Sequence, residues 1–133
     1  MRRVLRPMAP AVCMAVLVGA LPAGAGAPSI LDFDDWMQQV DDGSQDLQRH
    51  LAARDSKAAT AAARELEKLY GLMEEFFGKR RESAAAVGYS REGREFARSA
   101  LRDLAAGKFV AARRSALALA RGCRDCHDEF KPL

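Results

Sequence analysis

Apolar residues recur at helical spacing in four segments of the chain, and no segment of any length alternates as a strand would. The first stripe opens with Phe33 and Trp36, and the second ends with Met73, Phe76 and Phe77. Two further stripes fill the second half of the chain. Short connections join the four segments, so we expect an all-α protein, an antiparallel up-down-up-down four-helix bundle.

The ends of the first two helices are predicted from residues that favour helix termini. Aspartates at 32, 34 and 35 lie where a helix N-terminus favours negative charge, so the first helix is expected over about Asp34–Ala53. Asp55 or Ser56 is expected to cap the second helix. That helix should reach at least Phe77.

The third helix is expected to begin after Gly88 with Ser90 as its N-cap, and to stop at Gly107. Pro132 should end the fourth helix. The residues that we expect the fourth helix to bury are Phe109, Ala112, Ala116, Leu119, Ala120, Cys123, His127 and Phe130.

The N-terminus has the order of segments that is typical of a secretory signal peptide. Three arginines precede an apolar stretch over about residues 8–21, and small residues follow at 25–27. Prolines and glycines interrupt the stretch, which is shorter than the roughly 20 apolar residues of a membrane span. We therefore expect residues 1–27 to be removed, and residues 28–133 to form one periplasmic domain without a membrane span.

The fourth helix carries the sequence Cys123-Arg124-Asp125-Cys126-His127, the C-x-x-C-H signature of c-type haem attachment. Two thiols three residues apart lie on one face of a helix, about 5 to 6 Å apart at Cβ. That separation suits addition to two vinyl groups along one porphyrin edge. His127 is then expected to bind the iron as an axial ligand.

Three other interpretations of the motif are weaker. A zinc site needs about four ligands, and residues 28–133 offer only Cys123, Cys126, His127 and the distant His50. A thioredoxin-like site requires a βαβ setting that the pattern does not predict. A disulfide between the two cysteines would be an awkward ring on a helix and would leave the adjoining histidine unexplained.

The residue opposite His127 decides between electron transfer and the binding of a small molecule. In an up-down bundle, Met37 and Met73 both lie level with the C-terminal end of the fourth helix. His50 lies 13 residues beyond Met37, which is about 20 Å along the helix. The spacing leaves Met37, Met73 and an open position as alternatives.

An exported four-helix chain that ends in Cys-x-x-Cys-His-x-x-Phe-Lys resembles the class II c-type cytochromes, namely cytochrome c prime and its low-spin, methionine-ligated relatives. The likeness covers nearly all of residues 28–133. In the low-spin members the sixth ligand is a methionine early in the first helix, followed later by an apolar residue, as Trp36-Met37 and then Leu47 stand here. The resemblance implies that Met37 is the sixth iron ligand. The second helix lacks the Phe-Pro often found at its end in the family.

The resemblance implies a monohaem electron carrier with His127 and Met37 as axial ligands and no enzymatic activity. The alternative is a five-coordinate cytochrome c prime that binds nitric oxide or carbon monoxide. Redox proteins are the expected partners, and relatives often form dimers through their first two helices. Trp36, Tyr70, Phe76 and Phe77 are expected to lie at the haem end of the bundle.

Charge is divided unevenly between the two halves of the expected domain. All 18 acidic residues follow Ala27, whereas three of the 21 basic residues precede it, so residues 28–133 hold 18 of each and are neutral. The chain lacks the concentrated basic face that nucleic-acid binding requires. The second half, which carries the motif, is the positive one. Solvated surface explains this most simply, and docking of an acidic partner is the alternative.

Overall fold

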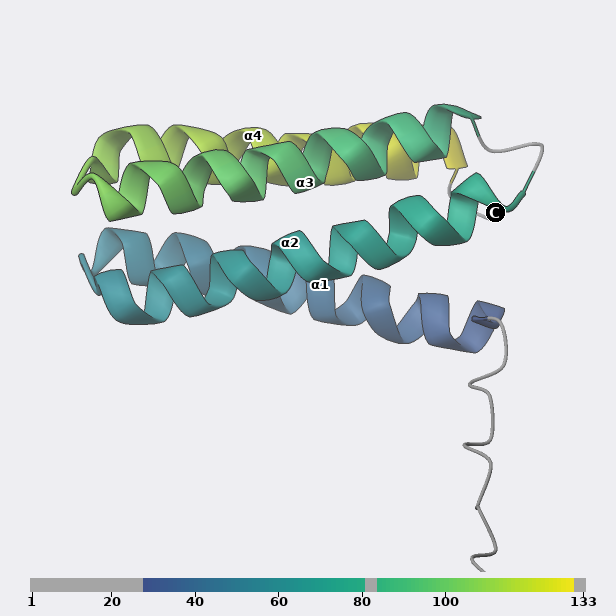
Figure 1. Cartoon of the computed structure of the whole chain (residues 1–133), viewed down its shortest axis with the longest axis horizontal. Coiled ribbons are helices and arrows are strands. Elements are labelled where there is room, and N and C mark those ends of the chain that lie inside the picture. The colour runs from purple at the N-terminus through teal and green to yellow at the C-terminus, as the bar shows by residue number, and fades with distance from the viewer. Residues whose placement is uncertain (1–27, 81–83, 131–133) are drawn as a thin grey trace, which may run out of the picture.

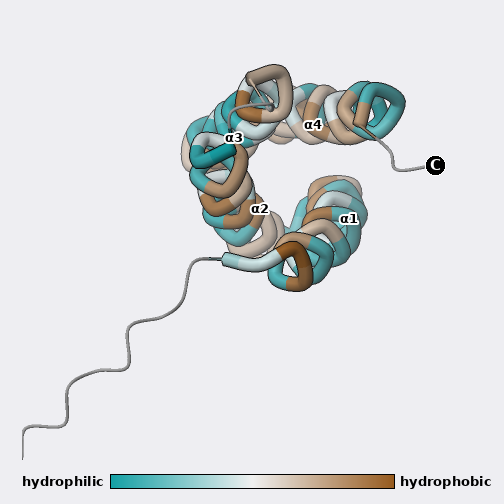
Figure 2. Tube along the Cα trace, turned by 90° about the vertical axis from the view of Figure 1, so that its right-hand side faces the viewer, coloured by the Kyte–Doolittle hydropathy of each residue, from teal (hydrophilic) through white to brown (hydrophobic). Residues whose placement is uncertain are grey.

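The computed structural model describes residues 28–80 and 84–130, which form four helices and, within these ranges, no strand. Each helix runs antiparallel to the one before it (Figure 1), and α4 returns to the side of the bundle that α1 occupies (Figure 2) and contacts it. The prediction of an all-α four-helix bundle is confirmed. The helices are α1 (Ile30–Ala52), α2 (Ser56–Gly78), α3 (Ala84–Ala105) and α4 (Phe109–Phe130).

Helix α1 begins at Ile30, four residues before the predicted start. Ser29 and Asp32 form a capping box, in which the Ser29 side chain accepts a hydrogen bond from the Asp32 amide. The Asp32 carboxylate in turn accepts from the Ser29 amide at 2.7 Å. Both free N–H groups thereby gain a partner, so the helix can start early.

The connections between α1 and α2 and between α3 and α4 contain the caps that the sequence predicts. The Asp55 side chain accepts a hydrogen bond from the Ala58 amide at 2.9 Å and caps α2, as expected. Gly107 has a φ of +69°, a left-handed conformation that glycine adopts without strain, and α3 ends just before it. Helix α2 includes Gly78 and ends there.

The predicted start of α3 is wrong. The helix begins at Ala84, and Ser90 is a buried residue of its interior rather than an N-cap. Its Oγ donates a hydrogen bond of 2.8 Å to the carbonyl oxygen of Ala86, one turn earlier. Three alanines at 84–86 favour helix strongly, so helix continues through Gly88 at little cost.

The buried face of α2 changes from small to large residues along its length. Ala59 and Ala63 are buried near its start, whereas Tyr70, Met73 and Phe76 are buried near its end. The antiparallel α3 is small where α2 is large, since its buried residues near that end are alanine, serine and glycine. Large residues thus pack against small ones, which lets the two helices approach closely.

None of the four helices has an apolar stretch long enough to cross a bilayer. The expected signal peptide at residues 1–27 lies outside the described residues, as do Lys131 and Pro132.

Candidate cofactor site

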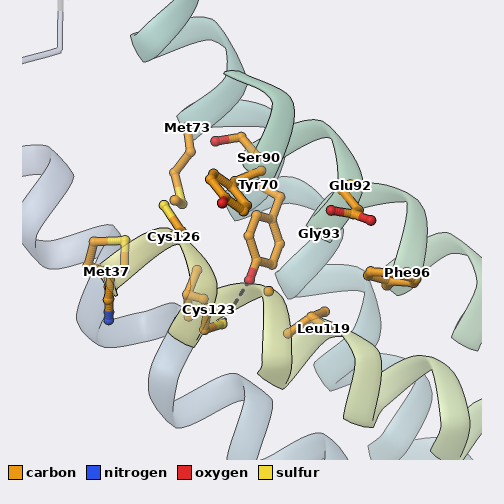
Figure 3. Close-up of a pocket in the computed structure, with 14 residues that line it drawn as sticks. Met37, Tyr70, Met73, Ser90, Glu92, Gly93, Phe96, Leu119, Cys123 and Cys126 are labelled. Atoms are coloured by element: carbon orange, nitrogen blue, oxygen red, sulfur yellow. Dashed lines mark hydrogen bonds between the residues drawn. The ribbon is translucent and has the colours of Figure 1, made fainter. Parts of the chain in front are cut away.

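A pocket lies at the end of the bundle where α1 and α3 begin and α2 and α4 end, and all four helices line it. The side chains that line it nearly fill it and leave a cavity of about 20 Å³. Figure 3 shows Met37 and Met73 reaching toward Cys126 from two different helices, with Tyr70 beside Cys123. The structure therefore brings together the motif and both candidate methionines.

Both thiols of the motif are free, half-buried and part of the pocket wall. The Tyr70 hydroxyl and the Cys123 Sγ share a hydrogen bond of 3.1 Å. Burial raises the pKa of Cys123, although the hydrogen bond from Tyr70 opposes the shift. Burial, with the neighbouring Cys123, raises the pKa of Cys126 to about 11. Both groups are therefore protonated thiols at neutral pH.

His127 also lines the pocket, but its residue is exposed, contrary to the prediction that α4 would bury it. Phe130 was predicted to be buried as well, and it is 39% exposed. Both belong to the last turns of α4, at the end of the bundle, where neighbouring helices cover little of the surface. The Phe130 ring instead meets the Tyr89 ring edge-on, with 6.2 Å between centroids.

The other residues expected in the α4 interior differ in depth. Ala112, Ala116 and Leu119 are buried as predicted. Phe109, Ala120 and Cys123 are only half-buried. The fully buried face of α4 thus ends at Leu119, and beyond it the helix faces the pocket.

The two candidate methionines differ in their packing. Met73 is 4% exposed and belongs to the continuous core. Met37 is half-buried and packs against the edge of that core. Both side chains line the pocket, so its lining alone leaves the choice between them open.

An aromatic cluster lies beside the pocket end of the bundle, as the sequence predicts. The Phe33 ring stacks on Phe76 at 5.0 Å, and Trp36 meets Phe76 edge-on at 6.1 Å. Phe77 contacts both phenylalanines edge-on. The Arg80 guanidinium lies 4.0 Å from the centroid of the Phe76 ring. Phe33 also belongs to this cluster, although the sequence analysis did not predict it there.

Two contacts of the pocket were not foreseen. Gly93 is buried against Tyr70, so close that a Cβ atom on residue 93 would lie 2.4 Å from the Tyr70 Cε1. The Tyr89 hydroxyl donates a hydrogen bond of 3.0 Å to the Glu129 carboxylate and joins α3 to α4. The contact between Gly93 and Tyr70 could have been suspected only from the presence of a glycine on the buried face of a helix.

His50 lies in the last turn of α1, at the opposite end of the bundle from the motif. Among residues 28–80 and 84–130, no three histidine, cysteine or acidic side chains gather as a metal-binding group.

Comparisons with protein-family models, with curated proteins and with solved structures found no match for the chain. The function must therefore be argued from the motif and from the geometry of this pocket.

Proposed function

We propose that the chain is an exported monohaem c-type cytochrome that carries electrons. Cys123 and Cys126 would hold haem c through two thioethers, with His127 and Met37 as axial ligands of the iron. The bound group would supply one-electron chemistry by alternating between ferric and ferrous iron. The proposal rests on one observation. The cysteines and the histidine of the C-x-x-C-H motif line a pocket that Met37 and Met73 also line.

The donor set fits a covalently held haem. Both thiols of α4 line one pocket and are free, and the imidazole of His127 lines the same pocket one residue further on. Helix spacing keeps the two thiols on neighbouring positions of one face. The side chains that line the pocket leave a cavity of only about 20 Å³, so they would have to move apart to admit a porphyrin, and the exposed His127 lies on the pocket wall.

Met37 is the better candidate than Met73 for the second axial position. Met73 is fully enclosed in the core, where a flexible apolar side chain filling a gap is sufficient explanation. Met37 lies at the core edge on α1, the helix that neighbours α4. Its side chain is therefore less tightly packed than that of Met73, and its sulfur is more accessible from the pocket. The family resemblance selects the same residue.

The pocket wall is largely apolar, which suits an electron carrier, although Glu92 and His127 also line it. Val40, Phe96 and Leu119 contribute apolar wall, and the aromatic cluster lies beside it. Tyr70 holds the Cys123 sulfur through its hydroxyl. An apolar, enclosed environment raises the reduction potential of such a centre, as does a methionine ligand.

The first experiment asks whether haem is covalently attached. The protein, produced in a host that exports it and attaches haem, should keep its haem through acid-acetone extraction and denaturing electrophoresis. Cys123→Ala with Cys126→Ala should abolish this retention. Complete loss of haem from the unaltered protein would rule out the covalent assignment.

The second experiment compares Met37→Leu with Met73→Leu, two changes that conserve volume and should each cost less than about 1.5 kcal/mol. Met37→Leu should remove the sulfur-to-iron charge-transfer band, lower the potential and allow carbon monoxide to bind. Met73→Leu should leave all three unchanged and serves as the matched control. The opposite result would assign the ligand to α2, and no effect of either change would favour the gas-binding alternative.

A further inference from the structure

The ion pairs of the described residues lie mainly on α2 and α3. All four glutamates of α2 and all four arginines of α3 take part in ion pairs, and three of these pairs join the two helices. Arg98, for example, donates to Glu67 at 2.8 Å. The basic side chains at one end of the bundle differ, because they gather there without carboxylate partners.

These basic side chains lie at the end opposite the cofactor pocket, where one connection joins α1 to α2 and another joins α3 to α4 (Figure 1). A surface depression there is lined by Arg54, Lys108 and Arg114, together with Val110, and none of its described lining residues is acidic. All three basic residues are exposed. The Arg54 guanidinium lies 5.8 Å from the centroid of the Phe109 ring, which favours its position at the edge of this depression.

A second, smaller depression lies between α4 and the last turns of α1. It is lined by Arg113 and Leu117 of α4 and by Gln48 and Leu51 of α1, and again no acidic residue is among its described lining residues. The Arg113 side chain is exposed. Positive charge therefore continues from the first depression along α4.

The α4 residues of both depressions share one face of the helix, because residues 110, 113, 114 and 117 are spaced by three or four positions. Two of them are apolar and exposed, since Val110 is 70% exposed and Leu117 is 47% exposed. We define the basic patch as Arg54, Lys108, Val110, Arg113, Arg114 and Leu117. Within the part of the chain that the structure describes, no carboxylate lies within 4.0 Å of the cationic groups of the patch.

The acidic residues near this end of the bundle leave the patch positive. Asp46 pairs with Arg49, and the Asp55 carboxylate accepts a hydrogen bond from the Ala58 amide. Asp103 is half-buried and lines neither depression. The other aspartates of α1 belong to its first half, which begins at the pocket end.

We propose that the basic patch binds the surface of an anionic phospholipid bilayer and attaches the protein there peripherally. Its four cations meet lipid phosphate groups, while Val110 and Leu117 enter the boundary between headgroups and acyl chains. Aliphatic side chains together with arginine and lysine are typical of segments that lie in this boundary. The patch needs no cofactor, so the proposal is independent of the proposed electron transfer.

An anionic bilayer is a better partner than an acidic protein. The centre of a protein interface is well packed and poor in charged residues, whereas the two aliphatic side chains of the patch lie among four cations. Lipids move laterally, so a phosphate can reach each cation without a matching arrangement of carboxylates. A bilayer also accommodates Val110, which projects from the first turn of α4.

Binding through the basic patch leaves the cofactor pocket accessible. The patch lies on the first half of α4, whereas Cys123 and Cys126 line the pocket near the other end of that helix. A protein attached in this way presents its pocket end to the solvent or to another protein at the membrane.

The test is cosedimentation of the protein, purified from the exporting host, with vesicles of equal parts phosphatidylglycerol and phosphatidylcholine. The protein should bind at low salt and be released at about 1 M salt, where the Debye length is about 3 Å. Arg113→Ala with Arg114→Ala should lower the partition coefficient by at least about tenfold, because each basic residue near an anionic surface contributes about fivefold. Vesicles of phosphatidylcholine alone should bind at least about tenfold more weakly for the same reason.

Two further double variants separate the patch from net charge. Val110→Ala with Leu117→Ala should lower the partition coefficient by at least about fourfold, the value of one buried methylene. Arg64→Ala with Lys68→Ala is the matched control and should leave it unchanged. These two side chains are exposed on α2, which lies across the bundle from α4 (Figure 2), and their loss removes the same charge. Far-UV circular dichroism of every variant excludes unfolding as the cause.

The proposal fails if the protein does not bind anionic vesicles at low salt or if it binds neutral vesicles equally well. Equal losses from the Arg113, Arg114 pair and the α2 control would attribute binding to net charge and would also overturn it. A protein that bound soluble polyglutamate but no vesicles would assign the patch to an acidic protein instead.

Discussion

The contact between Gly93 and Tyr70 predicts that Gly93→Ala destabilises the bundle, although alanine is the better helix former. A Cβ at residue 93 would lie 2.4 Å from Tyr70 Cε1, 2.6 Å from Cζ and 2.7 Å from Cδ1. Carbon atoms in contact are normally 3.5 to 4.0 Å apart. The two helices or the ring must therefore move by about 1 Å.

The cost follows from how tightly the ring is held. Tyr70 is 5% exposed, and its hydroxyl is fixed by the 3.1 Å hydrogen bond to Cys123. Overpacking a well-filled core costs about 1 to 3 kcal/mol, and this contact belongs at the upper end. The loss of a glycine from a helix interior returns about 1 kcal/mol. The expected net loss in the free energy of unfolding is about 2 kcal/mol.

Urea denaturation followed by far-UV circular dichroism measures this loss as a lower midpoint at an unchanged slope. Gly88→Ala is the matched control, because it lies on the same helix and a Cβ there would have no neighbour within 4 Å. It should stabilise the protein by about 1 kcal/mol. In a Tyr70→Leu background the penalty of Gly93→Ala should largely vanish. Equal stabilisation by both glycine changes would refute the close packing of α2 on α3.

Three further changes test the fold. Ser90→Ala should alter the free energy of unfolding by less than about 0.5 kcal/mol, because Ser90 bonds only to a carbonyl within its helix, whereas loss of a true N-cap would cost about 1 kcal/mol. Leu66→Ala, at a residue with 0% exposure, should cost about 2 to 5 kcal/mol by the same denaturation assay. Hydrogen bonds from Ser29 lower the pKa of Asp32, so its carboxylate stabilises the fold above the ordinary aspartate pKa and loses this effect as the pH falls through the lowered value. Asp32→Asn should therefore be less stable than the unaltered protein at neutral pH, and a difference that persisted at low pH would contradict the capping box.

The number and order of helices could be predicted because apolar periodicity is a local property of the chain. The ends were harder, since they depend on which of several competing polar groups caps the helix. Ser29 precedes Asp32 by three residues and could have been recognised as a capping box. Ser90 has the composition of a cap but bonds within α3, because Ala84–Ala86 favour helix ahead of it.

The site could be predicted in part, because some of its residues follow from local sequence and from the order of the helices. The cysteines and His127 form a local motif, and the antiparallel order brings Met37 and Met73 to their level. The bond between Tyr70 and Cys123 joins residues 53 positions apart, and no local pattern encodes it. The exposure of His127 was also missed, because helical periodicity indicates which face of a helix points inward but not how far its neighbours extend.

The pocket follows from where the buried face of α4 stops. Its last fully buried residue is Leu119, yet the helix continues for 11 residues to Phe130. Over this length its described side-chain hydrogen bonds to neighbouring helices are the one between Tyr70 and Cys123 and the one from Tyr89 to Glu129. Of the described residues beyond Leu119, none is fully buried, so this part of α4 gains less from packing than its first half. A large apolar group bound through Cys123 and Cys126 would supply the missing contacts. The same feature of the sequence thus places the proposed attachment site where α4 is least deeply buried.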